Sequence, residues 1–371
     1  MKLVLSGGGT GGHVYPALAI AEAFAQEPSF APFEALFVGT RERLEAQIVP
    51  SAGMPIAFVH AAPLARRLSL SIFSTIVTNA RGFVEALGVL HRARPDVLIA
   101  TGGYVALPVV AALRFVRALG RSKARIALLE PNAVAGLTNR LLTPLVDEVW
   151  LAVVPPGRVL GKREHLVGTP VRAAVRVPMT PAEGRRLLEI DPLKTTIVIM
   201  GGSQGARSLN DAATGLVEAG LPPGWQLVIV AGERDFERVG ARLSGRPSVR
   251  VLSYLREPRA AYAAADVLVT RAGASTLAEL AATAVPALLV PYPHASDDHQ
   301  MHNAYAYAQS GSARVLADAA LDPARLEAEV RSMLDVLPAL QSAARRAAQS
   351  DPRAAIVARV KAWSAANGID P

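Results

Sequence analysis

The chain has 371 residues, which is more than one ordinary domain needs and about right for two. Hydrophobic residues make up 51% and charged residues 19%, which excludes a largely disordered chain, and the lack of cysteine excludes disulfides, thiolate nucleophiles and cysteine metal sites. The formal net charge of +8 favours an anionic partner (a nucleotide, nucleic acid or acidic lipid), although a solvated arginine-rich surface explains it equally well.

The N-terminal residues lack the pattern of a secretory signal. Residues 1–6 run straight into a glycine cluster, which leaves no room for an apolar segment and a cleavage site. The longest apolar runs, such as residues 107–116, are far shorter than the ~20 residues that span a bilayer. We therefore expect a soluble or peripheral protein.

Strand and helix patterns alternate along the first half, which predicts a parallel sheet covered on both faces. Short apolar runs predict strands at residues 2–6, 35–38, 97–101 and 126–129. Helical periodicity is found at residues 15–25, 72–90 and 107–119.

The pattern breaks near Pro178 and Pro181 and then restarts, which predicts a second domain of the same α/β class. Its predicted strands are residues 196–200, 227–231, 249–252, 267–270 and 287–291. We expect an N-terminal domain at residues 1–171 and a C-terminal domain at residues 172–346. The last helical segment, residues 347–371, is expected to rejoin the first domain.

Three glycine-rich loops directly follow predicted strands, at residues 7–13, 102–104 and 201–206. Glycine lets the backbone turn sharply and approach a ligand closely, and the amides at the start of the next helix attract negative charge. The first and third loops are therefore candidate phosphate sites. Tight turns in an α/β protein explain any single loop, but not all three together.

The first loop has the glycine spacing of a dinucleotide site, through Gly7, Gly9 and Gly12. That site also needs an acidic residue at the end of the second strand, and the nearest acid, Glu42, lies beyond it. Nicotinamide or flavin binding is therefore disfavoured.

His13 ends this loop, just before the helix that Pro16 is predicted to help start. A helix N-terminus should lower the pKa of His13 and favour the neutral imidazole that a general base needs. A histidine that only packs the turn is an equally good interpretation.

Two polar segments in the second half have competing explanations. Thr276 and Glu279 have the spacing of a capping box, which spacing alone favours over recognition of a ribose by Glu279. Residues 291–303 contain three histidines and two aspartates, but their irregular spacing matches no standard metal site and suits hydrogen bonding to a sugar better.

With these loops in place, the chain resembles the MurG family of peptidoglycan N-acetylglucosaminyltransferases over nearly its whole length. The similar segments are GGGTGGHVYPALA, ATGGYVALP, EPNAVAGLTNR, GTPVR, GGSQGAR and RAGASTLAELAATAVPALLVPYPHASDDHQMHNA. The resemblance implies a GT-B fold: two Rossmann-like domains with a cleft between them. It implies inverting transfer of N-acetylglucosamine from UDP-N-acetylglucosamine to the muramyl 4-hydroxyl of a lipid-linked pentapeptide, in cell-wall precursor synthesis.

The resemblance also implies roles for individual residues, with His13 as the base. UDP-N-acetylglucosamine would contact Thr10, Gly11, Gly12, Asn132, Arg172, Ser203, the Leu255 backbone, Ala274, Ser275, Thr276, Leu277, Ala278, Glu279 and Gln300. Within this set, Glu279 would bind the ribose and Gln300 the sugar. The acceptor or its phosphates would contact Gly102, Gly103, Tyr104 and Glu130.

The resemblance also implies that no cofactor and no bound metal are needed, since helix termini and backbone amides would stabilise the departing UDP. Two departures from the family pattern stand out. Leu129 and Pro131 flank Glu130 where the family has histidine and glutamine, and the loop before Gln300 is one residue longer. The first removes any acceptor contact of that histidine, and the second weakens the assignment of Gln300.

A membrane-binding patch is predicted where apolar residues and arginines alternate, at Arg66, Arg67, Leu70, Ile72 and Phe73. An amphipathic helix packed on the sheet explains this segment equally well. The resemblance implies a peripheral protein on the cytoplasmic face of the bacterial membrane, with an anionic lipid surface and no nucleic acid among its partners. The alternatives are another UDP-sugar enzyme of this fold, such as an epimerase or a glycolipid synthase, and a UDP-sugar-binding protein without turnover.

Overall fold

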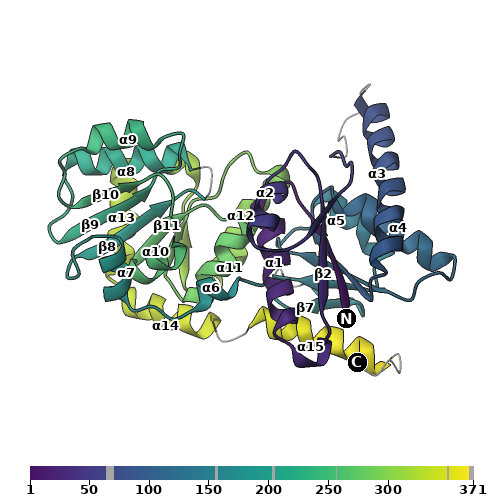
Figure 1. The fold of residues 1–371 in the computed structure, drawn as a ribbon. Coiled ribbons are helices and arrows are strands. Elements are labelled where there is room, and N and C mark those ends of the chain that lie inside the picture. The colour runs from purple at the N-terminus through teal and green to yellow at the C-terminus, as the bar shows by residue number, and fades with distance from the viewer. Residues whose placement is uncertain (64–70, 155–157, 203–204, 256, 349–350, 367–371) are drawn as a thin grey trace. The chain divides into compact units, whose positions relative to one another are not determined.

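The computed structural model describes residues 1–63, 71–154, 158–202, 205–255, 257–348 and 351–366. The chain divides into two compact units (Figure 1). Unit 1 comprises Met1–Arg172 and Asp351–Pro371, and unit 2 comprises Ala173–Ser350. Each unit is built on its own parallel sheet, so the predicted class of two Rossmann-like α/β domains is confirmed.

In unit 1 the described residues form a seven-stranded sheet in the order β3-β2-β1-β4-β5-β6-β7. Its strands are β1 (Lys2–Gly7), β2 (Glu34–Gly39), β3 (Ile56–Phe58), β4 (Val97–Gly102), β5 (Arg125–Glu130), β6 (Glu148–Leu151) and β7 (Glu164–Leu166). Its helices are α1 (Gly11–Ala25), α2 (Glu45–Ser51), α3 (Ser71–Ala93), α4 (Ala106–Ala118), α5 (Leu137–Leu142) and α15 (Pro352–Ala366), with short 3-10 turns at Pro28–Phe30 and Thr143–Leu145.

In unit 2 the described residues form a six-stranded sheet in the order β10-β9-β8-β11-β12-β13. Its strands are β8 (Thr195–Met200), β9 (Trp225–Val230), β10 (Val249–Leu252), β11 (Val267–Thr270), β12 (Ala287–Leu289) and β13 (Ala313–Val315). Its helices are α6 (Ala173–Arg176), α7 (Pro181–Leu187), α8 (Arg207–Ala219), α9 (Phe236–Leu243), α10 (Pro258–Ala264), α11 (Ala274–Thr283), α12 (His299–Ala308), α13 (Pro323–Leu334) and α14 (Leu337–Ala347), with 3-10 turns at Ser296–Asp298 and Asp318–Ala320.

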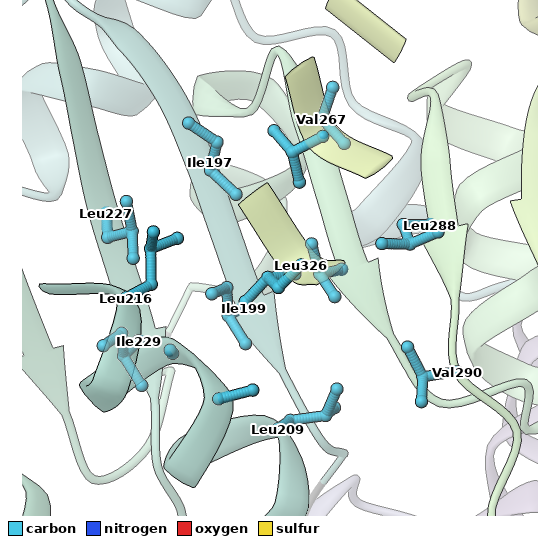
Figure 2. Packing of buried hydrophobic residues seen from close by; sticks show 14 of the residues in the cluster. Ile197, Ile199, Leu209, Leu216, Leu227, Ile229, Val267, Leu288, Val290 and Leu326 are labelled. Atoms are coloured by element: carbon cyan, nitrogen blue, oxygen red, sulfur yellow. The ribbon is translucent and has the colours of Figure 1, made fainter. Parts of the chain in front are cut away.

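The strands are short apolar runs because both faces of each sheet are covered. Figure 2 shows one face of the sheet in unit 2, where side chains of β8, β9, β11 and β12 meet Leu209 and Leu216 of α8 and Leu326 of α13. In unit 1 one core cluster joins the sheet to α1 and α15, and another joins it to α3 and α4. Each fully buried leucine or isoleucine in such a core contributes about 1.5–3 kcal/mol of transfer free energy.

In each sheet the strand order reverses once, and this point of reversal determines where a ligand can bind. The chain passes from β1 outward through β2 and β3, and then returns to β4 on the other side of β1. In unit 2 it passes from β8 through β9 and β10, and returns to β11. Loops at the carboxyl ends of β1 and β4, and of β8 and β11, diverge there and leave room for a ligand. The three glycine loops and the segment after β11 follow these four strands.

The last described helix, α15, packs in unit 1 through a buried carboxylate. The rings of Trp150 on β6 and Trp363 on α15 are stacked, with centroids 5.7 Å apart. Both indole N–H groups donate to the Glu148 carboxylate over 2.8 Å, and Arg359 donates to it as well. Burial alone would raise the pKa of Glu148, but the hydrogen bonds from Arg359, Trp150 and Trp363 outweigh burial and hold this pKa below its ordinary value of 4.5.

The lowered pKa makes the docking of α15 sensitive to acid. The stabilisation from the Glu148 carboxylate is complete above pH 4.5 and is lost as the pH falls further, through the folded-state pKa. We expect the near-ultraviolet circular dichroism of the tryptophan pair to fade in that range. Glu148→Gln should weaken it already at neutral pH and lower the stability of unit 1 by about 1–3 kcal/mol.

A second carboxylate that contacts α15 needs a control. Glu27 forms an ion pair with Lys361 on α15 over 2.8 Å, and the bonds from Lys361 and from the hydroxyl and amide of Ser29 together lower the pKa of Glu27 to about 2. Lys361→Met removes that ion pair but should leave the acid transition of the tryptophan pair in place. If Lys361→Met abolishes the transition and Glu148→Gln does not, Glu148 is not its cause.

Among the described helices, none combines the length and the apolar character that a membrane crossing requires.

Candidate functional site

The glycine loops of unit 1 pack so closely that side chains would not fit between them. A Cβ atom at Gly7 would lie 2.2 Å from Oγ1 of Thr101, and a Cβ at Gly103 would lie 2.5 Å from the Gly8 carbonyl oxygen. A Cβ at Gly9 would lie 3.3 Å from the ring of Tyr104, which covers this part of the loop. The two predicted loops at the ends of β1 and β4 therefore form one continuous surface.

A glutamate that the sequence did not single out supports the first loop. Glu45 begins α2 and is fully buried. Its carboxylate accepts hydrogen bonds from the amide of Gly9 at 3.2 Å, and from the amide and hydroxyl of Thr40 at 3.2 and 2.7 Å. Glu45 follows β2, but its carboxylate holds protein backbone in place and so does not stand in for the ribose-binding acid that the dinucleotide pattern needs.

His13 lies inside the first turn of α1, which begins at Gly11, so the prediction that it precedes the helix is wrong. Pro16 also lies inside the helix and not at its start. Thr10 is the exposed N-cap residue but makes no side-chain cap bond, and Gly11 and Gly12 are the first two helical residues. Threonine is a residue type favoured at N-caps, but the two glycines that follow Thr10 are poor helix formers, and they led the predicted helix start away from Gly11.

Thr101 holds His13 by two hydrogen bonds. The register between β1 and β4 shifts at Ser6 and Gly7, which leaves Thr101 as an extra residue on β4. The Thr101 carbonyl lies 2.8 Å from Nδ1 of His13, and the Thr101 hydroxyl donates to the His13 carbonyl over 2.7 Å. Because a carbonyl only accepts, Nδ1 carries hydrogen, and the neutral ring has its lone pair at Nε2. This is the tautomer that a base acting through Nε2 requires.

Beside His13 lies a second polar group that contains Glu130. Glu130 ends β5, is 2% exposed, and accepts from the amide and side chain of Asn132 at 2.9 and 3.1 Å and from Asn139 at 2.7 Å. Burial raises the pKa of this carboxyl group. A Cβ at Gly102 would lie within 3.1 Å of both His13 and Asn139, so these residues surround the end of β4.

Glu130 therefore orients Asn132, and its contact with the acceptor stays a prediction. Leu129, one of the two departures from the family pattern, is fully buried in the core of unit 1. Its side chain belongs to the hydrophobic core, so no substrate contact replaces the missing histidine at this position.

In unit 2, α11 begins at Ala274 with Gly273 as its N-cap, and no side-chain cap bond is formed. Thr276 and Glu279 are thus the third and sixth helical residues, so the capping-box interpretation is wrong. The amides of residues 274–276 precede the first intrahelical bond, from Leu277 to Gly273. Such amides are suited to a diphosphate. The Ser275 hydroxyl oxygen is buried there without a hydrogen bond among the described residues.

The Glu279 carboxylate is bonded to α10, one turn further along α11. The hydroxyl of Tyr262, a residue only 1% exposed, donates to Oε2 of Glu279 over 2.6 Å. Glu279 itself is half-buried. Its neighbours Leu277 and Leu280 are buried in the unit, so any contact of Leu277 with a nucleotide comes from its backbone.

Gln300 on α12 is fixed by two backbone amides. Its Oε1 accepts from Ala272 at 3.2 Å and from Tyr292 at 3.0 Å. Both partners are N–H donors, which orients the side-chain oxygen toward them and the Nε2 donor away. Asn303, one turn later, donates to the Ala272 carbonyl over 3.4 Å. The two α12 side chains thus support the residue that leads from β11 into α11.

A buried arginine joins the loops around this helix start. Arg271 follows β11 directly and is 8% exposed. Its guanidinium donates to Asp318 at 2.5 Å, to Ser208 at 2.8 Å, and to the carbonyls of Val290 and Pro291 at 3.1 and 3.2 Å. Arg271 begins the last of the segments that resemble the family, but the sequence does not indicate its hydrogen-bond partners.

The remaining predicted contacts are placed as follows. Ser203 lies outside the described residues. Leu255 is buried. Arg172 is the last residue of unit 1, and its guanidinium stands 4.8 Å above the ring of Tyr15, so the structure assigns it to unit 1 and not to the C-terminal domain.

Within the described residues, no three histidine, aspartate or glutamate side chains come together as metal ligands would.

Of the predicted membrane patch, Arg66, Arg67 and Leu70 lie outside the described residues, and the side chain of Ile72 is not described. Phe73, near the start of α3, is 75% exposed. Along the same face of α3, Ile76, Val77 and Val84 are 60%, 50% and 66% exposed. The helix α4 packs beside α3 (Figure 1), with the ring of Phe115 edge-on to Phe83.

Each unit has glycine loops at the point where its strand order reverses, which is where open α/β folds bind their ligands. The glycosyltransferase family 28 N-terminal domain matches residues 3–151, and the glycosyltransferase family 28 C-terminal domain matches residues 196–359. The fold and these matches define the chain as a glycosyltransferase.

Individual relatives cover most of the chain. It is 36% identical to the UDP-N-acetylglucosamine–N-acetylmuramyl-(pentapeptide) pyrophosphoryl-undecaprenol N-acetylglucosamine transferase of Desulforamulus reducens, over 90% of each chain. The enzyme of the same name from Symbiobacterium thermophilum is 39% identical, over 90% of this chain and 88% of that protein. The crystal structure of Acinetobacter baumannii MurG is similar with a TM-score of 0.75 at 26% identity, covering 97% of this chain and 99% of that one. The chain belongs to the MurG family.

Proposed function

We propose that the protein transfers N-acetylglucosamine from UDP-N-acetylglucosamine to the muramyl 4-hydroxyl of the lipid-linked muramyl pentapeptide, with inversion at the anomeric carbon. The relatives that cover 90% of the chain are named as N-acetylglucosamine transferases that use UDP-N-acetylglucosamine and N-acetylmuramyl-(pentapeptide) pyrophosphoryl-undecaprenol. The observation that carries the chemistry is the His13 ring, which Thr101 holds in the tautomer of a base acting through Nε2.

The donor is assigned to unit 2. The amides at the start of α11 and the Ser275 hydroxyl would bind the diphosphate, and Glu279 would accept hydrogen bonds from the ribose. The Nε2 donor of Gln300 would bind an oxygen of the sugar. Unit 1 would contribute the side chain of Asn132 and the loop at Thr10 to Gly12 to the sugar. In this proposal no resident metal or cofactor takes part.

The reaction is a direct displacement. His13 Nε2 accepts the proton of the acceptor hydroxyl while the oxygen of that hydroxyl forms a bond to the anomeric carbon. The bond from that carbon to the phosphate oxygen breaks, and the electron pair leaves with UDP. The amides at the helix start stabilise the charge that develops on the departing diphosphate. Atoms and charges balance without any further reagent.

The decisive experiment supplies labelled UDP-N-acetylglucosamine and the lipid-linked muramyl pentapeptide to the purified protein. We expect a labelled lipid-linked disaccharide and one UDP for each sugar transferred. Formation of an epimeric sugar without the acceptor would instead identify a different UDP-sugar enzyme. Tight donor binding with no UDP release in the presence of the acceptor would identify a binding protein without turnover.

We further propose that the exposed face of α3 binds the cytoplasmic face of the bacterial membrane, where this acceptor is anchored. A peripheral helix presents apolar side chains to the lipid and basic ones to anionic headgroups. On α3 the exposed apolar residues Phe73, Ile76, Val77 and Val84 accompany Arg81, whose side chain is 64% exposed.

The α3 face gives a direct binding prediction. Phe73→Ser with Ile76→Ser should lower affinity for vesicles containing anionic lipid by roughly 10-fold or more, because two apolar side chains no longer enter the interface. Donor affinity in solution should not change. Leu193→Ser is the matched control, since Leu193 is 92% exposed but lies in unit 2. Equal vesicle binding by all three proteins, measured by co-sedimentation, would contradict the proposal.

A further inference from the structure

The carboxylate assigned to the ribose is held by a buried phenol. Tyr262 lies on α10, its side chain is almost completely buried, and its hydroxyl donates to Oε2 of Glu279 over 2.6 Å. Burial, and then the charge of Glu279, raise the pKa of Tyr262 well above its ordinary value of 10.0. The hydroxyl therefore keeps its proton at any pH used for an assay and remains a donor.

The bond matters because a ribose makes a strict geometric demand. Its two neighbouring hydroxyls donate to one carboxylate only if the carboxylate presents its acceptor oxygens toward them. A glutamate side chain has three rotatable bonds, and the last of these has a broad energy minimum. A fixed donor on one oxygen restricts that rotation before the ligand arrives, so less ordering remains to be done on binding.

Packing alone does not explain why Tyr262 is paired with Glu279. Glu279 is the single acidic residue of α11, and it does not cap that helix, which starts at Ala274. A buried phenylalanine would fill the same space without leaving a hydroxyl to be satisfied. Instead, the buried hydroxyl of Tyr262 meets this carboxylate, which is itself only half-buried and so remains accessible from one side.

We propose that Tyr262 is the positioning residue that sets the selectivity of the nucleotide site for ribonucleoside diphosphates over their deoxy analogues. The inference rests on the proposed function, because it takes Glu279 as the acceptor of the ribose hydroxyls. Tyr262 acts through Glu279, since its own side chain is buried.

The test compares dissociation constants of UDP and 2′,3′-dideoxy-UDP, measured by calorimetry. The dideoxy compound lacks both hydroxyls that Glu279 would bind. For the unaltered protein we expect UDP to bind roughly 10- to 100-fold more tightly, the range for hydrogen bonds to a charged group. Glu279→Ala should abolish the preference. Tyr262→Phe keeps the ring and the core packing, and it should remove most of the preference while dideoxy-UDP affinity stays nearly constant.

Tyr307→Phe is the matched control. The hydroxyl of Tyr307 is also buried in unit 2, but it makes no hydrogen bond to Glu279 among the described residues. This variant should keep the full preference for UDP.

The outcomes separate the two proposals. An unaltered protein with equal affinity for both ligands would refute the role of Glu279 and, with it, that of Tyr262. A clear preference that survives Tyr262→Phe would overturn the positioning role alone and leave the proposed function standing. An equal loss of affinity for both ligands in Tyr262→Phe would also overturn it, because it would show a residue needed only for packing.

Discussion

Replacing His13 with alanine is expected to lower kcat by about 10²–10⁴-fold, the usual contribution of a positioned general base. The affinity for UDP-N-acetylglucosamine should change little, because the diphosphate and ribose contacts proposed above come from unit 2 and the proposed sugar contacts of unit 1 do not include the His13 ring. The contacts with Thr101 support this expectation: the bond from Nδ1 to the Thr101 carbonyl fixes the direction of the ring and leaves the lone pair on Nε2, and the Thr101 hydroxyl holds the His13 backbone carbonyl. Substrate-saturated UDP release gives kcat, and calorimetry gives the affinity for the donor.

The matched control is His91→Ala, which removes an exposed histidine from the last turn of α3 in the same unit. It should retain full activity. A His13→Ala variant whose donor affinity falls in parallel with kcat would show that the ring contacts the donor or supports the glycine loop. In either case His13 would not be the base.

The parallel sheets were predictable because a strand covered on both faces is a continuous apolar run. The clearest example is β11, which has the predicted bounds of 267–270. The starts of α1 and α11 were predicted too late in the sequence, because the residues that follow the N-caps Thr10 and Gly273 are glycines or alanine and neither helix start has a side-chain cap bond. The spacing of Thr276 and Glu279 indicated a cap, but the helix starts earlier, at Ala274, with Gly273 as its N-cap.

The glycine loops and His13 could be found from the sequence because each directly follows a predicted strand. The residues that hold them could not. Thr101 meets His13 from 88 positions away, and Tyr262 meets Glu279 from 17 positions away. Contacts of this kind depend on which strands become neighbours, and hydrophobic periodicity carries no information about that. The role of Glu45 was missed although its partner is close in the sequence, because a turn after β2 places its carboxylate against Thr40.

Replacing Arg271 with methionine is expected to destabilise unit 2 by about 3–5 kcal/mol, because it leaves a mostly buried carboxylate without its partner. The side chain of Asp318 is only 19% exposed, and its other bonded group, Ser208, is itself held by Arg271. Two backbone carbonyls after β12 also lose their donor. Hydrogen exchange followed by mass spectrometry should show faster exchange in β11, β12 and α8 but unchanged protection in unit 1.

Asp318→Leu added to Arg271→Met should restore part of the lost stability, since it removes the stranded charge together with its partner. The control is Arg242→Met, which breaks an ion pair with Glu218 on a surface where both side chains are about 40% exposed, and it should have a much smaller effect. An Arg271→Met protein as stable as that control would mean that the arginine is retained for ligand binding. Loss of donor affinity without faster exchange would then be the expected finding, and the network around Arg271 would be part of the nucleotide site and not its support.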